Sequence, residues 1–555
     1  MNNQPDYSKN NWPYFFIGIA VLLNFTGLFT PIMGPDGTLY ATIAKTMVQR
    51  NDYVQLFAYN TDWLDKPHFP FWVTALSFKL FGINTWAYKL PGILFMLMGA
   101  AYTYLFARKL YSKEVGQWSV VILLTAQHII LSNSDVRAEP YLTGLIIAAV
   151  YHFYNACARN SFWQLLLASI FTACAIMTKG MFALVPIGGA IAGHLIITKQ
   201  WKLLFNLRWL LAAVLILLFV LPEIYCLYRQ FDAHPEKVVF GRTNVSGIRF
   251  FFWDSQFGRF FNTGPIKGHG DPSFFIHTTL WAFLPWSLIL FAAIYHFIKT
   301  GINNVKAREW FCISGALLTF VLFSASKFQL PHYLNIVFPF FAIITAQYLS
   351  SLRSVKTLKL VGAVQISLII LLLVIITVLH YYYRPVEFNW HIGLALAIWL
   401  ALLLIVPYSF PETDFRRTAV RTFITSVIIN LYLNLAFYPS LLRYQAGSEA
   451  AMWINKHNTD TLPVAQNYEI GSHPMEFYIK PGIITLYPDK HSLTPAGPFI
   501  FYGHPADVLA LAATGRVVQQ LAVFPHYPIT RLKREFLNHT TRAATLDTMQ
   551  VVLVK

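Results

Sequence analysis

Apolar stretches of about 20 residues with almost no charge recur along most of the chain, and they limit its fold more than any other feature. An α-helix needs roughly 20 apolar residues to cross the hydrocarbon core of a bilayer. Of the 555 residues, 56% are hydrophobic and only 12% are charged, a composition typical of multi-pass membrane proteins rather than soluble enzymes. We therefore predict an α-helical polytopic membrane protein with about thirteen spans. The predicted spans are residues 10–35, 90–107, 115–134, 140–158, 160–178, 180–197, 209–228, 272–298, 310–326, 328–352, 360–383, 388–411 and 422–442.

The positive charge of the chain lies mainly in alternate loops between these spans. The formal net charge of +17 could suggest a nucleic-acid partner. If the N-terminus is cytoplasmic, however, Lys and Arg collect in the loops on that side, which is the positive-inside pattern of membrane proteins. We therefore expect membrane lipids and no nucleic acid as partners, and an odd number of spans places the C-terminus outside. The opposite short loops carry only Arg137, Lys179, Lys327 and Arg384.

The character of the sequence changes at residue 443, where polar residues return. Short apolar runs at 499–503, 520–524 and 549–555 predict strands, and residues 504–515 predict a helix closed by glycine. We therefore divide the chain into a membrane domain, residues 1–442, and a small extracytoplasmic α/β domain, residues 443–555. The chain has no glycine-rich phosphate loop, so no nucleotide cofactor is expected.

Ionisable residues also collect at the span ends that this topology places outside. Such residues are costly beside apolar segments and are usually kept for a partner or a substrate. Each has a simpler interpretation when taken alone. Asp36 could cap the amphipathic helix that follows it, and Arg137 could form a structural ion pair with Asp135 or Glu139. The residues concerned are Asp36, Asp62, Asp65, Lys66, His68, Asp135, Arg137, Glu139, Lys179 and Lys327.

Together these residues suggest a pocket that handles a lipid phosphate on the outer side. Lys66 offers a compact cation to a phosphate oxygen, and Arg137, Lys179 and Lys327 could do the same from other loops. Sugar transfer from a lipid phosphate needs stabilisation of the departing phosphate and a carboxylate that accepts a proton from an acceptor hydroxyl. Asp36 could supply that carboxylate.

Several motifs in order along the chain resemble bacterial membrane glycosyltransferases of the GT-C class. They are "GPDGTLYATIAKTM", "DWLDKPHFPFW", "DVRAEPYL", "CAIMTKGMFALVP", "FLPWS" and "SKFQLPHYLNIVFPFFAI". The resemblance is to the family that joins protein O-mannosyltransferases with lipid A aminoarabinose transferases. It implies an undecaprenyl-phosphate-sugar donor, an inverting transfer on the periplasmic face of the bacterial inner membrane, a core of about thirteen spans and a soluble C-terminal domain.

The resemblance also implies three sets of site residues. The catalytic residues would be Asp36, Asp65 and Glu139. The substrate-binding residues would be Lys66, Arg137, Lys179, Lys327 and Tyr333, with Lys66 at the donor phosphate. A divalent metal ion would be held by Asp65 and His269, although His269 alone could be an ordinary loop histidine.

The sequence departs from the family pattern at two of these positions. Gly37 follows Asp36 where many members carry Glu, and Glu139 stands where they carry Asp. A role that needs paired carboxylates after the first span is therefore not expected of Asp36.

We expect a glycosyltransferase that uses an undecaprenyl-phosphate sugar and modifies a lipid A-like lipid, a glycan or a protein hydroxyl. A phosphate acceptor is already an anion and needs no base, whereas a hydroxyl acceptor does. Two alternatives stay open. A flippase or transporter for lipid-linked sugars would need polar residues near the middle of the bilayer, whereas the charges here lie near span ends. A non-catalytic membrane scaffold would leave the one-sided cluster of charges without a role.

Overall fold

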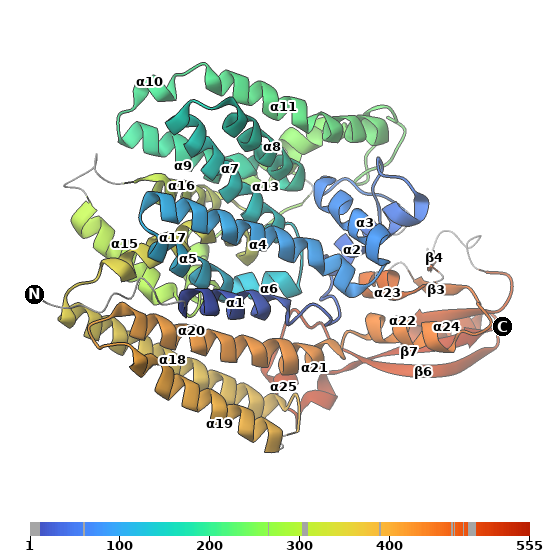
Figure 1. Ribbon diagram of the computed structural model, residues 1–555. Coiled ribbons are helices and arrows are strands. Elements are labelled where there is room, and N and C mark those ends of the chain that lie inside the picture. The colour runs from blue at the N-terminus through green and yellow to red at the C-terminus, as the bar shows by residue number, and fades with distance from the viewer. Residues whose placement is uncertain are drawn as a thin grey trace, which may run out of the picture.

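The computed structural model describes residues 12–58, 61–264, 266–301, 309–387, 390–467, 470, 472–480, 482–486 and 495–555. Helices form a large bundle, and a mixed β-sheet lies beyond one end of it, beside α2 (Asp36–Arg50) and α3 (Phe69–Phe81) (Figure 1). This is the predicted fold class: a polytopic helical protein with a small α/β region at its C-terminal end.

Among the described residues, eight helices are long and apolar enough to cross a membrane, or up to nine if the bent pair α5 (Lys113–Thr125) and α6 (Gln127–Ser134) forms one span. Many of their outward side chains are exposed and apolar, as α18 (Val355–Tyr383) shows most clearly. Such a surface fits a lipid environment rather than water. The eight are α4 (Thr85–Leu110), α7 (Glu139–Arg159), α8 (Phe162–Lys179), Trp201–Asp232 with α11 (Arg208–Leu227), Pro331–Ser351 with α17 (Phe338–Ser351), α18, Trp390–Ser409 with α19 (Trp390–Ile405), and Phe415–Leu442 with α20 (Phe415–Tyr432).

Shorter apolar helices lie where the sequence predicts the remaining spans. The first of them ends early, at Phe25, beyond which the carbonyls of Gly27 and Thr30 accept hydrogen bonds from Lys89 Nζ of α4, at 2.9 and 2.7 Å. The predicted span 272–298 is interrupted, with Phe283–Trp286 between its two helices. These shorter helices are α1 (Trp12–Phe25), α9 (Leu184–Ile197), α14 (Phe274–Ala282), α15 (Ser287–Gly301) and α16 (Phe311–Ala325).

The interruption between α14 and α15 lies against the bend between α5 and α6. Gln127 N–H, at the start of α6, donates to the carbonyl oxygen of Leu284 at 2.9 Å, and the indole N–H of Trp286 donates to Thr125 Oγ1 at 3.0 Å. Pro285 has no N–H with which to continue a helix, and its carbonyl accepts from Gln365 Nε2 at 2.7 Å. Backbone groups freed by a break inside a membrane need internal partners, and here the two breaks and Gln365 supply them.

Loops that the charge pattern assigns to the cytoplasm meet at the end of the bundle opposite the sheet. Tyr111, after α4, donates to Glu309, before α16, at 2.6 Å. Arg416, at the start of α20, donates to Glu114 of α5 at 2.6 Å. The alternation of loops predicted from charge therefore agrees with the way the helices run up and down the bundle.

The sheet has five strands in the order β4-β3-β5-β7-β6. β3 pairs in parallel with β4 and β5, and β7 pairs antiparallel with β5 and β6. The predicted strands β5, β6 and β7 and the predicted helix α24 (Pro505–Ala513) are confirmed, whereas β3 and β4 were missed because each is very short. The strands are β3 (Val464–Asn467), β4 (Ile484–Leu486), β5 (Phe499–Gly503), β6 (Val518–His526) and β7 (Asp547–Val554).

The sheet region has its own apolar core between the strands and α22 (Ala446–His457) and α23 (His473–Tyr478). It also contacts the bundle, because α23 packs against α2. We call residues 443–555 the C-terminal domain; the boundary at residue 443 stays a prediction.

Candidate active site

The first group of site residues joins the start of α2 to the junction of α6 and α7. Arg137 Nη1 donates to Asp36 Oδ2 at 2.6 Å, and Arg137 Nη2 donates to Asp135 Oδ2 at 2.7 Å. Asp36 is the first residue of α2, and no side chain makes a capping hydrogen bond there. The capping interpretation of Asp36 is therefore wrong, and the expected ion pair of Arg137 with Asp135 is confirmed.

Neighbouring side chains explain why glycine, rather than a residue with a larger side chain, follows Asp36. A Cβ atom on Gly37 would lie 2.8 Å from Asp135 Oδ1 and 3.1 Å from the Ile32 side chain. The space in which a second carboxylate would stand is thus filled by Asp135. Burial raises the pKa of Asp135, and this outweighs the opposing effect of Arg137. Asp36 itself is half exposed, so its carboxylate remains accessible to an acceptor.

The second group lies in the loop before α3. The carboxylate of Asp65 accepts hydrogen bonds from Lys66 and from Arg259 of α13 (Ser255–Phe261). Burial opposes ionisation of Asp65, but Lys66 and Arg259 together lower its pKa. Burial also lowers the pKa of Lys66, although Asp65 favours its charged form. One carboxylate thus holds two cations, which leaves a net positive charge for an anionic ligand.

The third group lies at the start of α7. Glu139 is buried and accepts a hydrogen bond from Lys179, the last residue of α8, and its Oε1 lies 3.7 Å from His332 Nε2. Lys179 Nζ also lies 3.8 Å from the centre of the Tyr333 ring, a favourable cation–π geometry. Glu139 is therefore the counter-ion of Lys179 and not the partner of Arg137.

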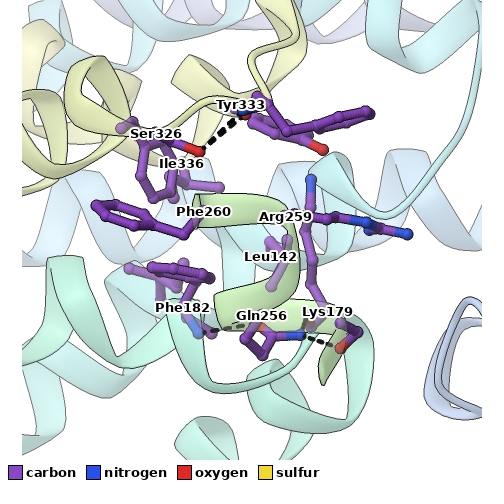
Figure 2. Close-up of a pocket in the computed structure, with 14 residues that line it drawn as sticks. Leu142, Lys179, Phe182, Gln256, Arg259, Phe260, Ser326, Tyr333 and Ile336 are labelled. Atoms are coloured by element: carbon purple, nitrogen blue, oxygen red, sulfur yellow. Dashed lines mark hydrogen bonds between the residues drawn. The ribbon is translucent and has the colours of Figure 1, made fainter. Parts of the chain in front are cut away.

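A pocket of about 650 Å³ of empty space opens between the second and third groups. Lys179 and Arg259 extend along one side of it below Tyr333, whereas Phe182 and Phe260 lie on the other side (Figure 2). Ligand pockets are mostly apolar with a few placed polar groups, and the lining of this pocket has that character. The pocket thus combines two cations with aromatic walls, as a lipid phosphate requires. Its remaining walls include Leu142, Ile146, Ala183, Ser255, Gln256, Phe323, Ser326, Phe328 and Ile336.

Tyr40 of α2 lies close enough to all three groups for their charges to act on its hydroxyl. Its side chain is buried, and burial raises the pKa of its hydroxyl well above the usual value. The carboxylates of Glu139, Asp65 and Asp36 raise this pKa further, so all three lie within electrostatic range of one hydroxyl. The predicted catalytic carboxylates therefore face one region of the protein.

Two residues of the run Trp201–Asp232 hold the loop that carries Asp65 and Lys66 by hydrogen bonds. Glu223 Oε2 accepts from the backbone N–H of His68 at 3.0 Å, and Glu223 Oε1 lies 3.0 Å from His68 Nδ1. Gln230 bonds both the N–H and the C=O of Leu56, at 2.9 and 2.8 Å. Glu223, the one charge within the predicted spans, thus has a structural role in holding this loop.

Two predicted residues lie at the edge of the site. Lys327 is exposed, and its backbone N–H donates to the carbonyl of Phe260 at 3.0 Å. His269 is also exposed, in a loop that packs by Gly270 against Ser326 and Lys327. Neither side chain is drawn into the ion-pair groups.

The predicted metal site does not fit the arrangement seen here. Both oxygens of Asp65 accept from cations, Oδ2 from Lys66 and Oδ1 from Arg259, so a divalent ion would have to displace one of them. Across the described ranges, no three His, Cys, Asp or Glu side chains gather as a possible ligand set. We therefore derive no chemical step through a metal, and the pairing of Asp65 with His269 stays a prediction.

Three residues that the structure places at the site were not predicted from the sequence: Arg259, His332 and Gln256. Arg259 lies in the long outer loop, 194 positions from its partner Asp65, and no local pattern connects the two. His332 was visible beside Tyr333 in "LPHY", and its neighbour's assignment could have drawn attention to it. Gln256 donates to the Lys179 carbonyl at 3.3 Å and accepts from Phe182 N–H at 3.4 Å.

Comparison with known proteins first defines the class. Residues 65–226 match the family model described as dolichyl-phosphate-mannose-protein mannosyltransferase. In fold, the chain is similar to ArnT from Cupriavidus metallidurans, solved bound to undecaprenyl phosphate, with a TM-score of 0.73 and 20% identity over 98% of each chain. The fold is the GT-C fold, as predicted.

Proteins with similar sequences indicate a more specific type within the GT-C class. The chain is 25% identical to an undecaprenyl phosphate-alpha-4-amino-4-deoxy-L-arabinose arabinosyl transferase of Edwardsiella ictaluri, over 60% of this chain and 58% of the relative. A protein of the same description from Pseudomonas aeruginosa is 26% identical over 54% of this chain and 52% of the relative. An uncharacterised Aquifex aeolicus protein is 25% identical over 62% of this chain and 65% of the relative. The chain thus spans less than two thirds of the length of these relatives. Together with the fold, they confirm the resemblance to the lipid A aminoarabinose transferase type.

Proposed function

We propose that this chain is an inverting glycosyltransferase that moves a sugar from an undecaprenyl-phosphate-linked donor to an extracytoplasmic acceptor. Among the acceptors considered, a lipid A-like lipid is favoured by the resemblance of the chain to lipid A aminoarabinose transferases, with which the description of the relatives as arabinosyl transferases agrees. The proposed location is the bacterial inner membrane, with the site on the periplasmic face.

The observation that carries the proposal is the pocket that holds Lys179 and Arg259 between aromatic walls. Cations beside apolar walls suit a phosphate attached to a hydrocarbon chain, because the phosphate needs charge-assisted hydrogen bonds and the chain needs apolar surface. Lys66 adds a third cation next to Arg259, since both contact Asp65.

The reaction follows from this placement. The bond between the anomeric carbon and the donor phosphate oxygen breaks, and undecaprenyl phosphate leaves with the electron pair. Lys66, Lys179 and Arg259 stabilise the charge that develops on the phosphate, which is a main source of catalysis in such sites. The acceptor oxygen forms the new bond on the opposite face of the sugar, so one displacement inverts the anomeric centre.

An acceptor hydroxyl must lose its proton as the new bond forms. Asp36 is the accessible carboxylate of the site, and it accepts that proton. If the acceptor is a phosphate, no proton needs to be removed, and the role of Asp36 and Arg137 is to orient it.

The test is a transfer assay with the purified full-length chain. Radiolabelled undecaprenyl-phosphate sugars, including 4-amino-4-deoxy-L-arabinose, are incubated with the protein and a lipid A fraction. We expect labelled acceptor and free undecaprenyl phosphate to form in equal amounts, and the Lys179→Ala variant to form both far more slowly. The matched variant Lys202→Ala, which changes an exposed lysine of α10 (Trp201–Leu204) at the other end of the bundle (Figure 1), should behave like wild type.

The same assay separates the alternatives. A flippase would move the labelled donor across proteoliposomes without releasing undecaprenyl phosphate. A scaffold would do neither. Absence of released undecaprenyl phosphate with every donor sugar would therefore contradict the proposed transfer.

A further inference from the structure

The segment that leads into Asp36 is held by side chains of the C-terminal domain. The backbone N–H of Gly34 donates to Gln445 Oε1 at 2.7 Å, and Gln445 Nε2 donates to the carbonyl of Ile32 at 3.0 Å. The backbone N–H of Ile32 donates to the hydroxyl of Tyr478 at 2.8 Å. The backbone around Ile32 and Gly34 is thus paired with residues more than 400 positions away.

The fit around these hydrogen bonds is close. Gln445 is buried, and one amide group satisfies both a donor and an acceptor of the segment. A Cβ on Gly34 would lie 3.0 Å from Pro474 and 3.1 Å from Gln445 Oε1. The hydroxyl of Tyr478 also lies 3.0 Å from Thr85 Oγ1, at the start of α4. At Gly34, therefore, Pro474 and Gln445 leave little room for a side chain between the segment and the C-terminal domain.

A lysine of α2 makes a second connection. Lys45 is buried, and its Nζ donates to the carbonyls of Glu476, Phe477 and Ile479 at 2.8, 3.0 and 2.6 Å. These carbonyls lie at the C-terminal end of α23, where the helix dipole favours a positive charge. Three N–H groups of one ammonium thus meet three carbonyl acceptors, which offsets the cost of burying the charge. The helix that begins with Asp36 is therefore fastened to the C-terminal domain as well.

We propose that the C-terminal domain is a clamp that positions Asp36 for transfer. Gln445 and Tyr478 hold the backbone just before Asp36, and Lys45 holds the helix just after it. Only Pro35 separates Gly34 from Asp36, and its ring restricts its φ angle. Holding Gly34 in place therefore also restricts the position and orientation of Asp36. Gln445, Tyr478 and Lys45 are positioning residues, and this inference rests on the proposed function of Asp36.

The experiment compares Gln445→Ala and Tyr478→Phe with the matched variant Gln466→Ala, all in the full-length chain. Gln466 is a buried glutamine of the same domain, in β3. Hydrogen–deuterium exchange of the peptide that covers Ile32–Asp36 measures the clamp without any substrate. We expect exchange at Gly34 in Gln445→Ala, and at Ile32 in Tyr478→Phe, to be about 5- to 10-fold faster, as expected for the loss of one buried hydrogen bond.

Transfer kinetics measure the consequence. We expect kcat to fall at least about tenfold in Gln445→Ala, because a small misplacement of a reacting group is costly, with the KM for the donor unchanged because Lys66, Lys179 and Arg259 are not touched. Tyr478→Phe removes a single oxygen atom, so it should fold even if Gln445→Ala does not. Its kcat should also be lower than that of the wild type. Gln466→Ala should change neither exchange at Ile32–Asp36 nor kcat.

The outcomes separate this inference from the proposed function. Faster exchange with unchanged kcat in both variants would overturn the positioning role, as would unchanged exchange. An inactive wild type, with donors that its relatives use, would overturn the proposed function and the clamp's catalytic role together. An active wild type with unaffected variants overturns the clamp alone.

Discussion

A single carboxylate, that of Glu223 in α11, is hydrogen-bonded twice to one residue, His68. It accepts from the His68 backbone N–H at 3.0 Å and lies 3.0 Å from His68 Nδ1, while His68 Nε2 lies 2.9 Å from the carbonyl of Val54. Both side chains are fully buried. His68 stands two residues after Lys66, so this contact sets where the Lys66 loop meets the bundle.

Glu223→Gln should therefore destabilise the protein. An amide has one acceptor oxygen where the carboxylate has two, so charge-assisted hydrogen bonds to His68 are replaced by weaker neutral ones in a buried place, which costs about 1–3 kcal/mol of unfolding free energy. Thermal unfolding in detergent measures the loss. The control is Glu236→Gln, because Glu236 makes the same 3.0 Å contact with His234 but both side chains are exposed. Equal melting temperatures for the two variants would contradict the role of Glu223.

Lys66→Ala should weaken the binding of undecaprenyl phosphate. A charge-assisted hydrogen bond to phosphate is worth about 1.5–3 kcal/mol, so we expect Kd to rise about 10- to 100-fold. Lys66→Arg should restore binding only in part, because a guanidinium is larger and planar. Equilibrium binding in detergent is the measurement, and Lys267→Ala, at an exposed outer lysine, is the control. An unchanged Kd in Lys66→Ala would remove this residue from the phosphate site.

Donor binding should also decline at alkaline pH. Burial lowers the pKa of Lys66, and the positive charge of Arg259 lowers it further. The carboxylates of Asp65 and Asp36 raise this pKa, but the net shift is downward. The ammonium therefore loses its proton at a lower pH than an ordinary lysine, and the affinity for phosphate falls as pH rises through that value. Binding titrations from neutral to alkaline pH test this. Lys66→Arg should hold its affinity to higher pH, because a guanidinium does not deprotonate there; parallel curves for both proteins would exclude Lys66 as the titrating group.

Asp36→Asn tests the base. Asparagine keeps an oxygen that can accept from Arg137, so the fold should be retained, but it cannot take up a proton. With a hydroxyl acceptor, transfer should fall by about 10²–10⁴-fold while donor affinity stays near wild type. With a phosphate acceptor the loss should be small and should appear in acceptor binding. Turnover near wild type with a hydroxyl acceptor would show that Asp36 is structural.

The orientation of the chain can be tested without substrates. Reporter fusions after Arg443 should be extracytoplasmic, and fusions within residues 353–359 should be cytoplasmic, because positive loops remain inside. A cytoplasmic reporter after Arg443 would overturn the predicted number of spans and the face on which the site lies.

Much of the membrane fold was accessible from the sequence, because apolar length and alternating loop charge are both local signals. The interrupted span around Pro285 shows where this approach fails. Hydropathy predicts one span across residues 272–298, whereas the break at Phe283–Trp286 depends on Gln127 and Gln365, which are distant in sequence.

The positions of several candidate site residues, though not their roles, can be compared with the prediction. Asp36, Asp65, Lys66, Arg137, Glu139 and Lys179 lie beside recognisable motifs, and the structure brings all of them into the ion-pair groups. The pairings themselves were not predictable. Glu139 pairs with Lys179 rather than Arg137, and Arg259 completes the Asp65 group, because side chains distant in sequence were brought together by the packing of α7, α8 and α13.

The position of β7 in the sheet determines when the site can be completed during biosynthesis. β7 lies between β5 and β6, and its Met549 and Val551 pack in the same core as Ala446 and Ile479, close in sequence to Gln445 and Tyr478. Asp36 is synthesised about 510 residues before β7. The hydrogen bonds that hold the segment before Asp36 can therefore form only after some 500 further residues have been synthesised and the C-terminal domain has folded.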